Sequence, residues 1–395
     1  MVGDSPQALV TNLSIAAMER YLANRHEAGF NAVWVNLLCN SGTGGRPDGA
    51  TDDGIAPFTI SGDLSTPNQA YFERVDAMIR IAAKYGIVVL LDPIETVGWL
   101  ETLLQNGPAK DFAYGRYLGA RYRTFPNIIW FNGNDLQEWR NPEVSAAVQA
   151  VARGIRAADE NHIHTVELNY ETSGSLDDSS WRPIIGLDAA YTYYPTYAQV
   201  LKEYNRPDFL PTFLVEASYE FEHYYEGPQT LRRQEYWALL SGATGQLYGN
   251  RFTWQFISGW QFLLDTVGVA QLTHVTKLFA GRRWWELVPD QKHSLVTAGY
   301  GTFATTGEPN ASDYVTAART PDGRLAIAYL PVLRPVIVNL RRLSGQVRAQ
   351  WYDPTTGEFS TVLGSPFANS RLRTFAPPGK NRDGDGDWVL VLTKV

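Results

Sequence analysis

The sequence predicts an α/β fold: a (β/α)8 TIM barrel followed by a small antiparallel β-sandwich domain. Short apolar runs alternate with helical patterns as far as Trp285, and repeated βα pairs form either an open doubly wound sheet or a closed barrel. Eight pairs, counting a stub of strand at residues 1–3, favour the barrel. Beyond Trp285 the chain changes to short alternating strands broken by turns, which is typical of a β-sandwich.

The expected barrel strands are rich in apolar residues, and one is continuously apolar, as strands buried on both faces of a parallel sheet tend to be. The run that begins at Ile87 has no polar residue before Asp92. The eight expected strands cover residues 1–3, 30–37, 87–92, 127–131, 164–168, 187–193, 212–215 and 245–248.

The intervening helices are predicted from apolar residues that recur three and four positions apart. The first has Asn12 or Ser14 as its cap and Gly29 just past its end. A long loop rich in Gly, Pro and Asp precedes the second and covers residues 39–68. The expected helices cover residues 13–28, 71–82, 112–123, 143–159, 198–204, 231–241 and 269–279.

The C-terminal part has turn signals such as Pro321-Asp-Gly323 and no convincing amphipathic helix. A boundary near Pro289 gives a catalytic barrel at residues 1–288 and a β-sandwich domain at residues 289–395, which we expect to pack mainly against the barrel. The acidic run at residues 383–387 resembles half a calcium loop. It lacks the glycine at the sixth position and the distal Glu of such a loop, so a solvated hairpin turn is favoured.

Charge and composition exclude several partners. A net charge of −7 argues against nucleic acid and against an anionic membrane surface. No apolar run reaches transmembrane length, and the N-terminus lacks the regions of a signal peptide. Because the chain starts just before its first helix, we expect that upstream sequence is missing. If it is, we expect a periplasmic or secreted bacterial protein; otherwise we expect a cytoplasmic one. The oligomeric state stays open.

Two acidic residues stand where an apolar strand ends. Asp135 follows the 127–131 run after Asn132-Gly-Asn134, and Glu216 directly closes the 212–215 run. Active sites of (β/α)8 enzymes are built at these strand ends. The two residues lie 81 positions apart, which fits strands separated by three βα units. A glycosidase needs such a pair, one acid to protonate the leaving oxygen and the other to attack the sugar.

Each acid has a structural alternative. Asp135 could cap a helix beginning at Leu136, and Glu216 could pair with a basic residue at the barrel rim. Glu220 and Glu222 are neighbouring competitors for the role of Glu216, but their loop or early-helix context favours contacts with substrate or solvent. Asp92 also ends a strand, but Pro93 follows it, which favours a structural or substrate-binding role.

Other motifs predict no cofactor and no metal. His162 and His164 stand at the start of their strand, away from the expected active mouth, and are interpreted as ordinary packing or surface histidines. Cys39 is the only cysteine, so thiolate metal sites and internal disulfides are excluded. The glycines at residues 42–45 do not follow a phosphate-binding order.

Several segments together resemble the apiosidase-like glycoside hydrolases, which are retaining clan-A barrels followed by a β-domain labelled collagen-binding. Each segment alone is weakly specific, but the ordered set, which spans nearly the whole chain, is specific. The barrel segments are Gly3-Asp4-Ser5, Gly29-Phe30-Asn31, Gly133-Asn134-Asp135, Glu216-Ala-Ser-Tyr219-Glu220 and Leu287-Val-Pro-Asp290; those of the β-domain are Tyr329-Leu-Pro331, Trp351-Tyr-Asp-Pro354 and Asp387-Trp388.

By this resemblance Asp135 corresponds to the acid/base and Glu216 to the nucleophile, while Asp4 and Trp254 line the sugar pocket. Glu167, Asn169 and Asn250 fall in the same pocket, where relatives often carry His, so the chain departs from the family there. The further substrate-binding candidates are Asn36, Asn134, Tyr193 and Tyr219.

We therefore expect a retaining glycoside hydrolase that acts on an oligo- or polysaccharide by double displacement. The alternative is a non-catalytic carbohydrate-binding protein on a barrel scaffold. A third reading is a structural or adhesion role that rests on the β-domain. The sugar, the linkage, and the choice between end and internal cleavage stay open.

Overall fold

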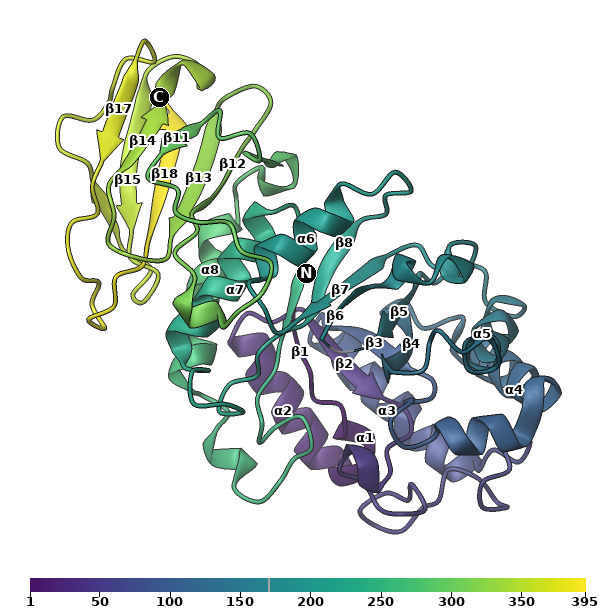
Figure 1. The fold of residues 1–395 in the computed structure, drawn as a ribbon. Helices are drawn as coiled ribbons and strands as arrows, with labels where there is room; N and C mark the ends of the chain where they lie inside the picture. The colour runs from purple at the N-terminus through teal and green to yellow at the C-terminus, as the bar shows by residue number, and fades with distance from the viewer. Residues whose placement is uncertain (170) are drawn as a thin grey trace. The chain divides into compact units, whose positions relative to one another are not determined.

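The computed structural model describes residues 1–169 and 171–395, and its first part alternates strands with helices (Figure 1). The strands of this part are β1 (Val2–Asp4), β2 (Ala32–Asn36), β3 (Val88–Asp92), β4 (Ile128–Leu136), β5 (His164–Leu168), β6 (Thr172–Gly174), β7 (Asp188–Thr192), β8 (Thr212–Glu216) and β9 (Gln246–Tyr248). The helices are α1 (Leu9–Asn12), α2 (Ile15–Glu27), α3 (Gln69–Lys84), α4 (Leu100–Tyr122), α5 (Pro142–Arg156), α6 (Thr196–Tyr204), α7 (Pro228–Leu240) and α8 (Val267–Phe279).

The strands form one sheet in the order β5-β4-β3-β2-β1-β9-β8-β7-β6. Each pair from β1 to β5 is parallel, and so is the pair β8 and β9. Every residue of β2, β5, β7 and β8 is buried, as the continuous apolar runs predict. β6 is a short extra strand, and the other eight are the barrel strands. The predicted (β/α)8 fold class is confirmed.

A serine joins β5 to β7, which are not neighbours in the backbone ladder. The Ser175 hydroxyl donates to the carbonyl of Val166 at 2.5 Å and accepts from the amide of Ala189 at 2.8 Å. The backbone amide of Gly186 also donates to the carbonyl of His164 at 2.9 Å. These bonds satisfy strand groups that would otherwise be buried without partners.

The helix starts follow local chemistry, with one difference from the expected bounds. Ser14 is the cap of α2, since its side chain accepts from the amide of Ala17 at 3.3 Å. The sequence pattern predicts that helix α4 begins near residue 112, but it begins at Leu100. Gly107, with a φ of 76°, breaks the helical geometry just before Pro108, and this pair looks like a helix terminator in the sequence.

Glycines allow the backbones of helices α4 and α5 to approach each other closely. A Cβ on Gly115 would lie 2.0 Å from the carbonyl oxygen of Val151, and one on Gly154 would lie 2.1 Å from that of Phe112. Any larger residue at either position would push the helices apart. The glycines therefore fix the place of α5, and with it the loop that joins β4 to α5.

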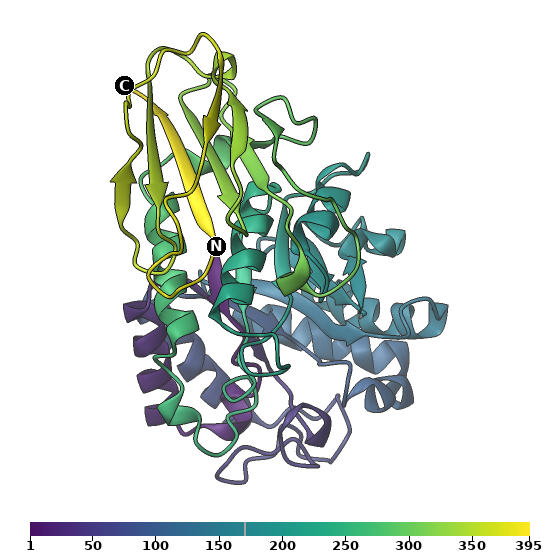
Figure 2. The same ribbon diagram turned by 60° about the vertical axis from the view of Figure 1, so that its left-hand side comes forward.

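The C-terminal part is antiparallel, and in Figure 2 its green and yellow strands stand side by side. Its strands are β10 (Val288–Pro289), β11 (Val296–Ala298), β12 (Thr316–Arg319), β13 (Leu325–Leu330), β14 (Val336–Asn339), β15 (Val347–Tyr352), β16 (Phe359–Thr361), β17 (Leu372–Phe375) and β18 (Trp388–Lys394). One sheet has the order β10-β12-β13-β18-β15-β16 and the other β11-β14-β17. Their buried residues, such as Val338, Trp351 and Leu390, share one apolar core, so the predicted sandwich is confirmed.

The chain divides into two compact units. The first contains residues 1–191 and 247–265, and the second contains residues 192–246 and 266–395. Helices α7 and α8 thus belong to the same unit as the antiparallel sheets. The boundary near Pro289, which separates residues 1–288 from residues 289–395, stays a prediction.

A buried ion pair joins α7 to the last strands. The guanidinium of Arg232 donates to both carboxylate oxygens of Asp387 at 2.8 Å, and neither side chain is more than 1% exposed. Asp387 also accepts from Tyr329 at 3.0 Å and from Asn381 at 2.9 Å. The expectation of a solvated turn at residues 383–387 is therefore wrong for Asp387, because its carboxylate neutralises a buried cation.

Replacing Asp387 by Ala is expected to destabilise the protein by about 3–5 kcal/mol, because it leaves the Arg232 charge buried without its main partner. Urea unfolding followed by circular dichroism measures the change. Asp322→Ala is the control, since that carboxylate pairs with Arg283 on the surface and its loss should shift the midpoint far less. Equal midpoint shifts in the two variants would contradict the prediction.

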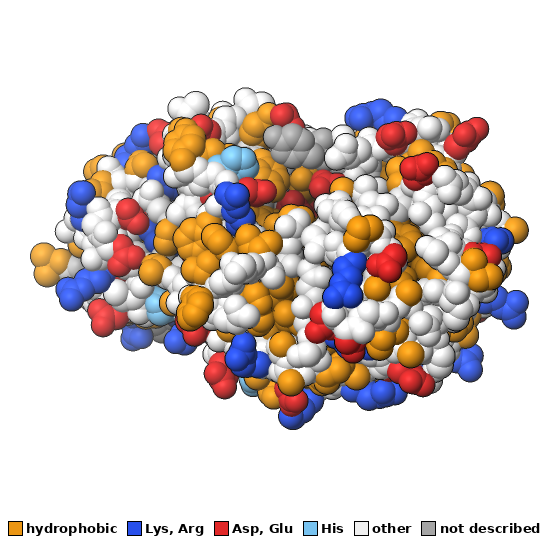
Figure 3. Space-filling model, turned by 90° about the horizontal axis from the view of Figure 1, so that it is seen from below, with side chains coloured by type: hydrophobic (Ala, Val, Ile, Leu, Met, Phe, Trp, Pro, Cys, Tyr) orange, Lys and Arg blue, Asp and Glu red, His pale blue; other side chains and the backbone are white. Residues whose placement is uncertain are grey.

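The outer surface fits the sequence-based view of charge. Figure 3 shows acidic and basic side chains interspersed on the face in view, without a large patch of one sign. Among the described residues, no helix has both the length and the apolar character needed to cross a membrane.

Candidate active site

The predicted site residues lie at or just past the C-terminal ends of the barrel strands. In the first unit, Asp4 ends β1, Asn36 ends β2, Asn134 and Asp135 lie near the end of β4, Glu167 lies near the end of β5, Asn169 follows β5, and Asn250 and Trp254 follow β9. In the second unit, Tyr193 follows β7, Glu216 ends β8 and Tyr219 comes three residues later. This is the end of the barrel at which such enzymes build their active sites.

Asp135 lies in a bulge of β4. Asn132 pairs with Val166 and Leu136 with Leu168, so residues 133–135 oppose Glu167 alone. The backbone turns through φ values of 70° at Gly133 and 44° at Asp135. Positive φ is uncommon for a residue with a side chain, and bulges of this kind re-aim side chains next to active sites.

Neighbouring loops hold the bulge in place. The amide of Gly133 donates to Asp92 Oδ1 at 3.1 Å, and the amide of Thr96 donates to Asn134 Oδ1 at 3.2 Å. The amide of Asp135 donates to Glu167 Oε2 at 3.1 Å. The strand-end residue Asp92 therefore supports the loop that carries Asp135.

The capping alternative for Asp135 is excluded by where α5 begins. The cap of that helix is Asn141, whose side chain accepts from the amide of Glu143 at 3.1 Å, and residues up to Leu136 still belong to β4. The Asp135 carboxylate is thus available for another role.

The environment of Asp135 favours its protonated form. Burial raises the pKa of this carboxyl, and a hydrogen bond from Tyr191 partly offsets the effect. No described residue forms a hydrogen bond to its buried Oδ1. A carboxyl that keeps its proton in a polar strand-end site can serve as a general acid.

Glu216 is oriented by two hydrogen-bond donors. It is 7% exposed, and two phenol hydroxyls approach its two oxygens: Tyr193 donates to Oε1 and Tyr219 donates to Oε2, each at 3.2 Å. Hydrogen bonds from O–H donors stabilise the ionised form of a carboxylate and fix its orientation. An ionised, oriented carboxylate is the form that a nucleophile needs.

Glu222 contacts Tyr193, a connection that no sequence pattern indicates. Its Oε2 is 3.1 Å from the Tyr193 hydroxyl oxygen. Burial, and then the charge of Glu226, raise the pKa of Glu222. Because one hydroxyl has one proton, a protonated Glu222 that donates to Tyr193 leaves the Tyr193 proton for Glu216.

The other predicted residues have mixed surroundings. The buried Asp4 carboxylate is 2.7 Å from the Arg25 guanidinium, and its pKa is raised by burial against the lowering effect of that charge. Asn36 accepts from Trp34 at 2.8 Å, and Asn250 donates to Tyr248 at 2.9 Å. The side chain of Trp254 is half-buried. Their roles in substrate binding stay predictions.

Glu220 has a structural position. Its Oε2 accepts from the Thr266 hydroxyl at 2.7 Å, and its Oε1 accepts from the amide of Gly268 at 3.3 Å. These contacts lie at the first turn of α8, where a negative charge complements the helix dipole. Glu220 is therefore a poorer candidate than Glu216 for catalysis.

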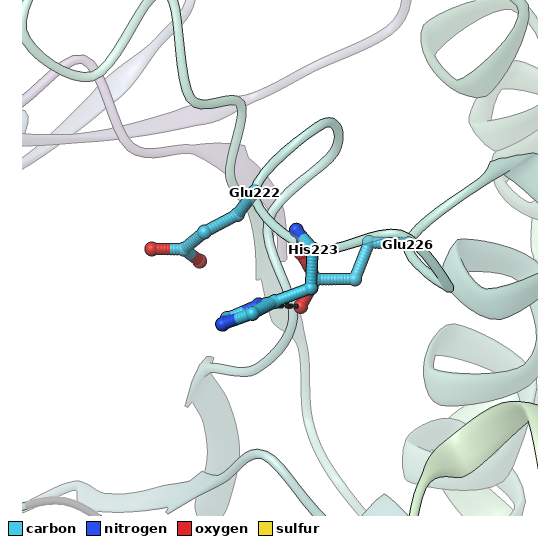
Figure 4. A group of neighbouring side chains, drawn as sticks. All are labelled: Glu222, His223 and Glu226. Atoms are coloured by element: carbon cyan, nitrogen blue, oxygen red, sulfur yellow. Dashed lines mark hydrogen bonds and ion pairs between the residues drawn. The ribbon is translucent and has the colours of Figure 1, made fainter.

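Glu222, His223 and Glu226 could offer three ligand atoms within 4.8 Å of one another (Figure 4). Figure 4 marks a contact between His223 and Glu226 and none from either residue to Glu222. Nδ1 of His223 is 2.9 Å from Glu226 Oε1, so these two side chains pair with each other. His162 likewise pairs with Asp159 Oδ2, at 2.5 Å, and burial lowers the pKa of His164 to about 3.

Sequence reasoning missed Tyr191. It falls inside the buried strand β7, two residues before Tyr193, and looks like a core aromatic. Residues two apart on a strand point to the same face, and this was the available signal that both tyrosines serve one side of the strand.

Comparison with known proteins agrees with this geometry. The family model "Apiosidase-like, catalytic domain" matches residues 1–286, and the model "Putative collagen-binding domain of a collagenase" matches residues 302–393. The comparison with curated proteins found no match.

Solved structures share the fold over the full chain. One, titled "Glycoside hydrolase", is 23% identical, with a TM-score of 0.84 and coverage of 100% of this chain and 92% of the other. A glycoside hydrolase family 5 protein from Bacteroides vulgatus is 22% identical, with a TM-score of 0.83 and coverage of 100% and 89%. Since the family model spans most of the chain, the protein belongs to the apiosidase-like family and is a glycosidase.

Proposed function

We propose that the protein is a retaining glycoside hydrolase in which Asp135 is the acid/base and Glu216 the nucleophile. The carrying observation is that the two carboxyls have complementary surroundings. Burial raises the pKa of Asp135, whereas two tyrosine hydroxyls donate to Glu216. The acid and the nucleophile of such a site are assigned from the environments of the two carboxyls, one of which must favour the protonated form and the other the ionised form.

In the first step Asp135 gives its proton to the glycosidic oxygen while Glu216 attacks the anomeric carbon. The bond to the leaving group breaks and a covalent glycosyl-enzyme forms. In the second step Asp135, now a carboxylate, takes a proton from water, the water oxygen attacks the anomeric carbon, and Glu216 leaves. Retention requires the two carboxyls to stand about 5–5.5 Å apart, whereas inversion requires about 6.5–9.5 Å.

Asn134 is the candidate for binding the substrate hydroxyl next to the anomeric carbon. Its Oδ1 is occupied by Thr96, and its amide nitrogen donates to none of the described residues. Asp4, Asn36, Glu167, Asn169, Tyr193, Tyr219, Asn250 and Trp254 complete the proposed substrate-binding set.

The experiment that tests this function is a screen of aryl glycosides and of plant and bacterial oligosaccharides. Proton NMR during the first minutes of hydrolysis of an active substrate reports the anomer that is released first. Release of the same anomer as the substrate supports the proposal, and release of the opposite anomer contradicts it.

Tyr193→Phe is expected to lower kcat/KM roughly 10- to 100-fold, because a hydrogen bond to a charged group is worth about 1.5–3 kcal/mol. Steady-state kinetics on the substrate found in the screen measures the change. Tyr224→Phe is the matched control: it removes a phenol hydroxyl from a side chain that is 87% exposed and bonded to Glu308. Equal kinetics of Tyr193→Phe and wild type would rule out this role for the Tyr193 hydroxyl.

A further inference from the structure

A groove of about 590 Å³ opens beside the loop that follows β4. Trp139, Arg140 and Ala146 line one part of it, and Asp177, Asp178 and Ser179 line another. Its volume falls in the range of small-molecule sites, which combine an aromatic or apolar surface with a few placed polar groups. All of these residues belong to the first compact unit.

Trp139 supplies the aromatic surface of the groove. Its Nε1 donates to Asn169 Oδ1 at 2.8 Å, so the ring is held in orientation while its side chain remains half-buried. The Arg140 guanidinium carbon is 4.0 Å from the ring centroid. Among the described residues, no carboxylate pairs with Arg140, so its N–H donors are available to a ligand.

A buried hydrogen-bond network keeps the polar wall in place. The Ser145 hydroxyl donates to Asp178 Oδ2 at 2.6 Å and accepts from Gln149 Nε2 at 3.0 Å. Ser145 is 6% exposed and Gln149 is 3% exposed. The amide of Ser180 donates to Asp178 Oδ1 at 3.0 Å. This network ties α5 to the segment after β6, so the groove is formed before any ligand enters.

A short series of contacts leads from the groove to Asp135. Asn169, which holds Trp139, lies two residues after Glu167, and Glu167 Oε2 accepts from the amide of Asp135. Residues two apart at the end of a strand share a face. Trp139, four residues after Asp135 in the chain, is thus connected to it through Asn169 and Glu167.

We propose that this groove is an accessory subsite for a distal residue of the glycan, and that it favours a neutral pyranoside chain. The inference rests on the proposed function of Asp135 and deepens it. The part of the tryptophan ring that Arg140 does not cover offers an apolar surface to sugar C–H groups, and the guanidinium offers donors to hydroxyls. Two carboxylates, of Asp177 and Asp178, outnumber the one guanidinium, so a uronic acid residue would meet net repulsion.

The test fills the groove without touching Trp139 or Asn169. Ala146 is exposed on α5 and lines the groove, so Ala146→Trp places a ring inside it. Ala157→Trp is the matched control, since Ala157 is exposed just past the other end of α5, roughly 16 Å away at 1.5 Å per residue. Melting temperatures show that both variants fold.

The probes are cellohexaose, β-1,4-mannohexaose and β-1,4-xylohexaose, with the 4-nitrophenyl monoglycosides of the same sugars. For the hexaose that is cleaved, the ratio of its kcat/KM to that of the monoglycoside should fall at least tenfold in Ala146→Trp and stay within twofold in Ala157→Trp. An unchanged ratio in Ala146→Trp would overturn the subsite.

Calorimetric titration tests the subsite even if none of the hexaoses is hydrolysed, because it measures binding alone. The hexaoses are titrated into Glu216→Gln with and without Ala146→Trp, and the added ring should weaken binding at least tenfold. Equal affinities would overturn the subsite, and tighter binding of hexagalacturonate than of the neutral hexaoses would overturn its preference for neutral chains. Failure of the catalytic proposal shows itself separately, as full hydrolysis by the Glu216→Gln variant.

Discussion

Glu216→Gln is expected to lower kcat on the order of 10⁴-fold while leaving the fold intact, because a neutral amide cannot form the glycosyl-enzyme ester. The residue is buried at the end of β8, and glutamine is nearly isosteric, so one tyrosine hydroxyl can still donate to its carbonyl oxygen while the other can accept from its amide nitrogen. Kinetics on an activated aryl glycoside measures the loss.

Two controls separate a catalytic effect from a structural one. Glu138→Gln changes the same group in an exposed turn and should behave as wild type. Sodium azide added to Glu216→Gly should restore turnover and give a glycosyl azide of inverted configuration, because the small anion enters the space of the missing side chain. More than a tenth of wild-type activity in Glu216→Gln would remove this residue from the mechanism.

Asp135→Asn should remove the alkaline limb of the pH profile of kcat/KM. The reaction begins with the protonated form of the acid, and burial raises the pKa of Asp135 above its ordinary value. The protonated fraction therefore persists to higher pH than in an exposed aspartate and falls as pH rises through the raised pKa. In wild type kcat/KM should fall across that same interval.

The size of the Asp135→Asn effect should depend on the leaving group. General acid catalysis contributes about 10²–10⁴-fold, and a leaving group that departs without a proton needs little of it. Natural oligosaccharides should lose the full factor, and 2,4-dinitrophenyl glycosides much less in the first step. A loss that is equal for all leaving groups, with the alkaline limb unchanged, would contradict the assignment of Asp135.

Much of the barrel could be predicted from the sequence, because its strands are buried and most of them are rich in apolar residues. The end of β4 could not. Its apolar run stops at Phe131, yet the strand continues to Leu136 through the bulge that carries Asp135. That bulge depends on contacts from Asp92, Thr96 and Glu167, which lie far away in sequence.

The sequence predicts those site residues that are carboxylates at the end of a strand. It does not predict the residues that act by a hydrogen bond to another site residue. Asp135 and Glu216 stand out from the apolar residues before them. Tyr191 does not, since it belongs to a buried strand, and Glu222 stood out only as a competitor of Glu216; its connection to Tyr193 appears only through a hydrogen bond. The acid at position 387 was misread for the same reason, because its partner Arg232 lies 155 residues earlier.

The attachment of α7 to the antiparallel sheets has a practical consequence for expressing the protein in pieces. Arg233 donates to the carbonyls of Pro309, Asn310, Ser312 and Pro331, and Trp237 donates to that of Tyr314. A gene cut after residue 288 would leave these donors without acceptors and the Arg232 cation without its carboxylate partners. Crystallisation trials and directed evolution should therefore keep the whole polypeptide.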